Sequence, residues 1–207
     1  MDKWDSYRTS AEKAMQMGRL DNAESYMYAA LTEAEDFERD DPRLLWTIER
    51  LAEILFRQQK YDQAEPMCKR AIETYEIHFG SDHPDVGILT NNLAMLCHLQ
   101  RKMDDAELLY KKALDMQTKT LGVNHPEVRN LLGNYANLLQ STHREAEAEH
   151  MRKMAKGIVT GKWNTSGTYR AFARENQIGT GQLQQELQAQ GTPKKDPDAP
   201  PALPPRR

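Results

Sequence analysis

The stretch HPDVGILTNNLAMLCHLQRKMDDAELLYKKALDMQTKTLG, residues 83–122, decides the fold of this 207-residue chain. Its pattern recurs in the flanking segments, so that residues 42–83, 84–125 and 126–167 align at a period of 42, and an earlier copy fits at an offset of 41. The positions that repeat are Pro42, Pro84 and Pro126; Ala52, Ala94 and Ala136; Ala64, Ala106 and Ala148; and Ala71, Ala113 and Ala155. Four copies in one register predict a repeat array.

Each copy is predicted to form two helices. In the second copy Leu44, Ile48, Leu51 and Leu55 have the three-to-four spacing of an amphipathic helix, and residues 67–72 begin another such pattern. The second helices are expected to end at Gly80 and Gly122, because glycine accepts the left-handed backbone that closes a helix. His-Pro follows each glycine, and His83 and His125 are assigned a turn or capping role.

A capping signature is predicted at the start of the second helices. It occurs as Asp21-x-x-Glu24, Asp62-x-x-Glu65 and Asp104-x-x-Glu107. In a capping box the first side chain accepts a backbone N–H of the first turn, and the glutamate reaches back to the cap residue. Pro66 is likewise expected in a first turn, where a missing N–H costs least.

The quoted stretch and its neighbours resemble the tetratricopeptide repeat, in particular the 42-residue form of kinesin light chains, over residues 4–160. The resemblance implies an all-α, right-handed helix-turn-helix solenoid of about four repeats, whose first helices line a concave groove. The chain departs from the family at the turn within each repeat. The favoured glycine is present as Gly18 but is replaced by Gln59, Arg101 and His143 in the later copies.

Three regions are predicted along the chain. Residues 1–160 form the array, with repeats at about 1–41, 42–83, 84–125 and 126–160, and residues 161–191 form capping or docking helices. These helices either cap the fourth copy, dock on a partner or fold back into the groove. Residues 192–207 are too rich in proline to pack and are expected to be disordered. Pro201, Pro204 and Arg206 match the proline motif that SH3-type grooves bind.

Composition excludes several classes of protein. The net charge is -3, and outside residues 192–207 the chain is more acidic still, which argues against a nucleic-acid partner. The sequence shows no secretory signal and no apolar run long enough to cross a membrane. Cys68 and Cys97 are too few for a disulfide framework and are expected to be buried small hydrophobes, which suits a cytoplasmic protein.

No catalytic or metal-binding constellation is recognised, so the chain is predicted to be neither an enzyme nor a holder of a cofactor or metal. P-loop, dinucleotide-binding and zinc-protease motifs do not occur in it. His98 is predicted near the inner face but has no carboxylate paired with it in the sequence.

The groove prediction rests on a second stripe along the first helices. Arg50, Asn92 and Asn134 are equivalent at the period of 42, and asparagine, a poor helix former, can hold a peptide backbone through its amide. The predicted partner-binding residues are Trp46, Glu49, Arg50, Glu53, Arg57, Asn91, Asn92, Met95, His98, Asn130, Asn134 and Asn137, with Ile88, Leu99, Gln140 and Ser141 as further candidates. The two-carboxylate clamp known in the family is not carried over, because its basic positions hold Glu12, Glu49, Asn91 and Gly133.

These observations predict a non-catalytic adaptor or scaffold that binds a protein or peptide in the groove. Two alternatives remain open: an assembly factor or chaperone for a multisubunit complex, and a regulator that senses a peptide or a small ligand. The sequence does not identify the partner or the oligomeric state.

Overall fold

The computed structural model describes residues 2–37 and 41–159, which form eight α-helices and no strand. The helices are α1 (Lys3–Gln16), α2 (Leu20–Glu35), α3 (Pro42–Arg57), α4 (Tyr61–Phe79), α5 (Pro84–Leu99), α6 (Met103–Thr120), α7 (Pro126–Ser141) and α8 (Glu145–Val159). The predicted all-α solenoid of helix-turn-helix units is confirmed. The predicted capping helices of 161–191 and the proline-rich tail of 192–207, with Pro201, Pro204 and Arg206, lie outside the described residues.

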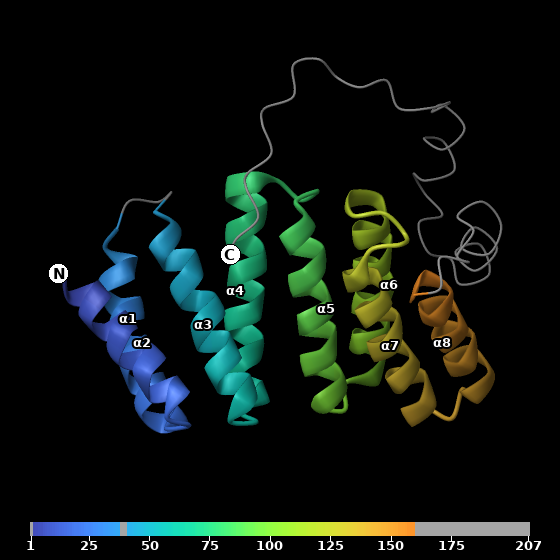
Figure 1. The fold of residues 1–207 in the computed structure, drawn as a ribbon, viewed down its shortest axis with the longest axis horizontal. Helices are drawn as coiled ribbons and strands as arrows, with labels where there is room; N and C mark the ends of the chain where they lie inside the picture. The colour runs from blue at the N-terminus through green and yellow to red at the C-terminus, as the bar shows by residue number, and fades with distance from the viewer. Residues whose placement is uncertain (1, 38–40, 160–207) are drawn as a thin grey trace, which may run out of the picture.

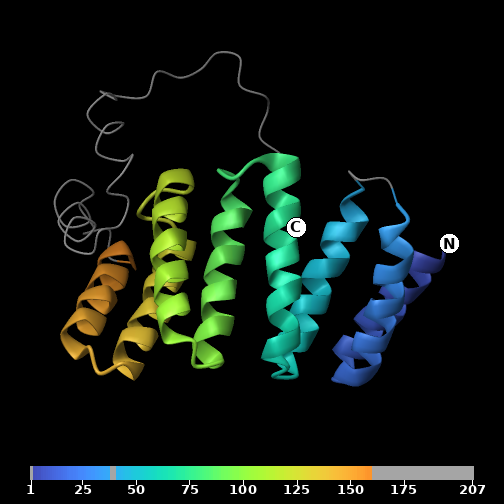
Figure 2. The same cartoon turned by 180° about the vertical axis from the view of Figure 1, so that it is seen from behind.

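The helices form two layers. Helices α1, α3, α5 and α7, the first of each pair, make one layer, and α2, α4, α6 and α8 make the other (Figures 1 and 2). Each helix packs against its neighbours in the chain, and α5 also contacts α7 directly. Because contacts are made only between neighbouring units, the chain extends as an array and presents a long face on each side.

The turn inside each pair uses one left-handed residue, and only the first copy has glycine there. Gly18, Gln59, Arg101 and His143 have φ of +70°, +61°, +64° and +61°. The residue after each one donates its N–H to a carbonyl five residues earlier, as Lys102 does to Cys97 at 2.9 Å. This is the Schellman arrangement, which satisfies carbonyls left open at a helix end. Three side chains therefore adopt a conformation that glycine adopts more readily.

The turns between pairs follow the prediction. Gly80 and Gly122 have φ of +86° and +84° after the second helices. The Nδ1 atoms of His83 and His125 accept backbone N–H groups from Asp85 and Glu127 at 3.3 and 3.2 Å, so both histidines cap the following first helix. The Asp41 side chain caps α3 in the same way.

The predicted capping boxes of the second helices are wrong. Helices α2, α4 and α6 begin after Arg19, Lys60 and Lys102, and none of these cap residues makes a side-chain cap hydrogen bond. The glutamates instead bind side chains of the next repeat, as the Glu24 carboxylate binds Lys60 at 2.6 Å. Pro66 lies in the second turn of α4 rather than the first, because the helix begins earlier than expected, at Tyr61.

The core consists of two adjoining apolar clusters that meet at α5, which contributes residues to both. The two ends of the array carry polar residues at positions that are apolar elsewhere. Lys13 occupies the position where the later repeats bury Ile54, Leu96 and Leu138, and Lys156 is exposed where the second and third repeats bury Ile72 and Leu114. Polar ends let a repeat array stop without exposing its core. Within the described residues, no helix combines the length and apolar character needed to cross a bilayer.

Candidate binding site on the first-helix face

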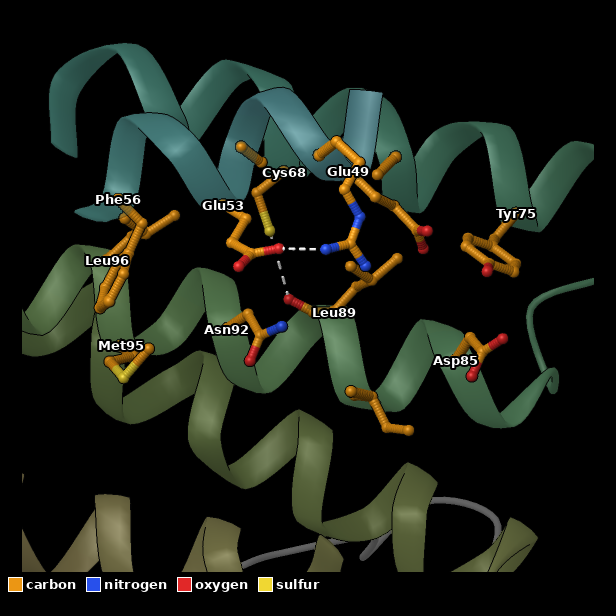
Figure 3. Close-up of a pocket in the computed structure, with 14 residues that line it drawn as sticks. Glu49, Glu53, Phe56, Cys68, Tyr75, Asp85, Leu89, Asn92, Met95 and Leu96 are labelled. Atoms are coloured by element: carbon orange, nitrogen blue, oxygen red, sulfur yellow. Dashed lines mark hydrogen bonds and ion pairs between the residues drawn. The ribbon is translucent and has the colours of Figure 1, made fainter. Parts of the chain in front are cut away.

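The first-helix face is the exposed side of α1, α3, α5 and α7, and it is hollowed between α3 and α5. A cavity of about 490 Å³ lies there, with α4 beneath it (Figure 3). Its lining comprises Glu49, Arg50, Ala52, Glu53 and Phe56 of α3; Cys68, Ala71 and Tyr75 of α4; and Asp85, Ile88, Leu89, Asn92, Met95 and Leu96 of α5. We call this space the central cavity. Its volume falls in the range of sites that enclose a small ligand or a few peptide side chains.

One end of the central cavity is apolar and the other is acidic. Phe56 and Leu96 lie at the first end, and Tyr75 and Asp85 lie at the other (Figure 3). Burial raises the pKa of the Tyr75 hydroxyl, and the carboxylates of Glu49 and Asp85 raise it further. That direction is the one expected when negative charge surrounds a group that would itself become an anion.

The guanidinium of Arg50 lies between the central cavity and a second hollow. It donates to the Glu53 carboxylate at 2.5 Å, and its carbon lies 5.8 Å from the centre of the Trp46 ring. Arg57 also approaches Glu53, at 3.8 Å. The second hollow, of about 590 Å³, is lined by Glu12, Met15 and Gln16 of α1 and by Trp46, Arg50 and Arg57 of α3. The two hollows share Arg50, so they form adjacent parts of one face.

The asparagines of α5 and α7 occupy three different environments. Asn91 is only 5% exposed, and its Oδ1 accepts a hydrogen bond from the Nδ2 of Asn134 at 3.3 Å. Asn92 lines the central cavity and is half-buried, whereas Asn130 and Asn137 are exposed. The Asn91–Asn134 bond therefore joins neighbouring first helices, and Asn92 is the α5 amide that faces the cavity.

The histidine of α5 and the cysteine beneath the central cavity are both engaged in contacts within the array. His98 Nε2 lies 3.1 Å from Ser141 Oγ, and burial together with Arg101 lowers the pKa of its imidazole. Cys68 donates its thiol to the Leu89 carbonyl at 3.5 Å, and burial raises its pKa to about 12, so little reactive thiolate forms. The described part of the chain contains no group of three His, Cys, Asp or Glu side chains placed to hold a metal ion.

The predicted residues divide between the hollows and the remainder of the face. Glu49, Arg50, Glu53, Asn92 and Met95 line the central cavity, and Trp46 and Arg57 line the second hollow. His98, Asn130, Asn134 and Asn137 lie on α5 and α7 outside both hollows.

Sequence reasoning missed the floor of the central cavity and its acidic end. Tyr75 and Cys68 belong to a second helix, where the repeat pattern indicates only core packing. Asp85 directly follows the proline that starts α5. An acidic side chain is common in a first turn because it interacts favourably with the helix dipole, so Asp85 gives no separate signal of a binding site.

Comparison with known proteins identifies the repeat. The sequence profile described as tetratricopeptide repeat matches residues 6–76, 43–119 and 89–155. No curated protein sequence matches the chain at a significant level.

Solved structures share the fold at low sequence identity. A putative kinesin light chain from Podosopora anserina with nearly identical TPR-like repeats has a TM-score of 0.67 at 18% identity, covering 77% of this chain and 76% of that one. BtubC (BKLC) from P. vanneervenii has a TM-score of 0.65 at 20% identity, covering 98% and 87%. The apo form of RapI has a TM-score of 0.66 at 12% identity, covering 90% of this chain and 66% of its own.

Proposed function

Because the chain belongs to the tetratricopeptide repeat family, we propose that it is a non-catalytic adaptor that binds a peptide or a partner surface on the first-helix face. The observation that carries this proposal is the central cavity, which opens on that face between two repeats and has an apolar end and an acidic end. Such a site accepts side chains of an extended segment, while polar groups beside it hold the backbone.

The contacts around the cavity suit a peptide. Arg50 and Glu53 already hold each other in place, so their side chains need little further ordering when a ligand arrives. The Asn92 amide can both donate to and accept from a peptide backbone. Asn134, whose amide donates to Asn91, lies on α7 and adds another polar group on the same face. A ligand that crosses α3, α5 and α7 would meet these groups in succession.

Affinity purification from the native host, followed by mass spectrometry, tests the proposal. The full-length chain with Asn92→Ala and Asn134→Ala is compared with the unaltered chain and with a control variant, Asn22→Ala, whose asparagine is exposed on α2 in the opposite layer. We expect the double variant to lose the specific partner and the control to keep it, with unchanged circular dichroism for both. Undiminished capture by a folded double variant would refute the assignment of the site.

A second candidate function is the sensing of a small ligand, which the volume of the central cavity favours. A ligand that binds only the folded chain raises its unfolding temperature. Thermal unfolding in the presence of a metabolite collection would reveal this, and the variant Met95→Trp, which narrows the cavity, should abolish the shift. Copurification of a stable protein partner without any such shift would favour the adaptor.

Assembly of a multisubunit complex through the second-helix layer finds less support. The exposed apolar side chains there include Leu108, Ile77 and Phe79. Leu108 lies near the start of α6, whereas Ile77 and Phe79 lie at the end of α4. Because the second helices run parallel, these residues lie toward opposite edges of the layer and do not form one apolar patch.

A further inference from the structure

The central cavity is net negative, which narrows the ligands that it can take. Glu49, Glu53 and Asp85 contribute three carboxylates to its lining, and Arg50 contributes one guanidinium, which Glu53 binds. The remaining lining is mainly aliphatic and aromatic, with Phe56, Leu96 and Met95 toward one end. An occupant that matches both features carries apolar or aromatic side chains next to lysine or arginine.

The chain itself contains such a segment. Residues 1–159 carry 21 lysines and arginines against 27 aspartates and glutamates, whereas residues 160–207 carry seven against four. Within this basic part, aromatic and basic side chains alternate from Tyr169 to Arg174 in the sequence YRAFAR, and Lys162 and Trp163 precede it. These residues lie outside the described ones.

The segment begins within reach of the cavity. Helix α8 ends at Val159, at the same edge of the array as the loop between α4 and α5 (Figure 1). The acidic end of the cavity lies beside this loop, because Tyr75 stacks on His83 with ring centroids 5.4 Å apart and Asp85 belongs to the first turn of α5. From α8 the path crosses α7 to α5, two steps of about 8–10 Å between packed helices. About six extended residues cover this distance. Tyr169 is ten residues beyond Val159, so its position in the sequence permits contact.

We propose that residues 162–174 bind the central cavity of the same chain as an autoinhibitory strap, with the aromatic side chains toward its apolar end and Arg170 and Arg174 toward Glu49 and Asp85. This inference rests on the proposed function, because an external peptide must displace the strap to use the same site. Attachment gives the strap an effective concentration in the millimolar range, so weak contacts suffice to fill the site. A partner must then displace the tethered strap, so only a partner of sufficient affinity or concentration binds the array.

Disulfide trapping in the full-length chain tests the proposal. Met95→Cys lies in the central cavity, and Phe172→Cys lies in the strap; the control pair combines Phe172→Cys with Leu108→Cys, which is 70% exposed on the opposite layer. The variant Phe172→Cys alone detects any bond to the native Cys68. At low protein concentration, we expect the Met95 pair to form an intramolecular disulfide at least tenfold faster than the control pair.

Charge reversal adds a second measurement. Arg170→Glu with Arg174→Glu should slow trapping of the Met95 pair several-fold, whereas Lys194→Glu with Lys195→Glu should leave it unchanged. Equal trapping rates for the Met95 and Leu108 pairs in folded chains, or disulfide-linked dimers in place of monomers, would overturn the strap. If the strap fails while the Asn92 and Asn134 variants still lose their partner, the proposed function stands and only its regulation by the strap is excluded.

Discussion

The carboxylate of Glu65 on α4 lies 2.7 Å from the Nζ of Lys102, the residue that directly precedes α6, the second helix of the next repeat. The same contact occurs between Glu24 and Lys60 at 2.6 Å and between Glu107 and Arg144 at 2.6 Å. An ion pair at this fixed position therefore joins each repeat to the next. Because the contact spans two repeats, it stabilises their packing rather than the start of its own helix.

Removing the central pair should destabilise the array. Glu65 is only 12% exposed and accepts from Lys102, Lys69 and Gln100, so Glu65→Ala removes the acceptor of two ammonium groups and one of the two acceptors of the Gln100 amide. We expect a loss of about 1–2 kcal/mol in the free energy of unfolding, measured by urea titration. The control is Glu73→Ala, an exposed glutamate on the same helix. Equal losses in both variants would show that the inter-repeat pair contributes nothing specific.

The same glutamate predicts a dependence of stability on pH. Hydrogen bonds from Lys102 and Lys69 lower the pKa of Glu65 from its usual 4.5 to about 2 in the folded chain. Because the folded value lies below the unfolded value, this contribution is fully present above about pH 5 and is lost as the pH falls toward 2. The stability gap between the unaltered chain and Glu65→Gln should therefore narrow over this interval in urea titrations. A gap that stays constant from pH 7 to pH 3 would contradict this assignment.

Glycine should improve the turn of the fourth repeat. His143 is exposed with φ of +61°, and the equivalent residue of the first repeat is Gly18. Glycine adopts the left-handed backbone without strain, but it also raises the conformational entropy of the unfolded chain. The first effect is the larger, so His143→Gly should stabilise the array by about 0.5–1 kcal/mol. The reverse change, Gly18→Ala, should destabilise it, and chemical denaturation measures both. Destabilisation by His143→Gly would indicate that the imidazole makes a compensating contact.

Two adjacent asparagines should respond differently to alanine. Asn91→Ala removes a buried acceptor from Asn134 and leaves space in the packed layer, so we expect a loss of about 1–3 kcal/mol. Asn92→Ala removes a half-buried side chain at the central cavity and should change stability by less than about 0.5 kcal/mol. Thermal unfolding of the two variants compares them directly. Similar losses would mean that both asparagines serve packing.

The two thiols should be unreactive in the folded chain. Cys68 and Cys97 are free and buried, and burial raises the pKa of both. At pH 7.5 an aromatic disulfide reagent should label neither cysteine on a timescale of minutes, and both after unfolding in guanidinium. Fast labelling of Cys68 in the native chain would show that the central cavity opens more widely than this structure does.

The sequence by itself determined the features that depend on local chemistry. The start of α3, α5 and α7 at proline, the histidine caps of α5 and α7 and the glycine turns after α4 and α6 all follow from residues a few positions apart. Such signals act through the backbone of their own segment, so they can be predicted without knowledge of distant parts of the chain.

Only the tertiary structure decided which side chains meet between repeats. The position of Glu65 in the sequence is compatible with a capping box, but in the fold its carboxylate binds Lys102 of the next repeat. Asn91 and Asn92 differ by about 100° around their helix, and the position of α7 decides which of them is buried. Tyr75 joins the cavity because α3 and α5 leave a space above α4. These outcomes depend on packing across repeats, which no local pattern encodes.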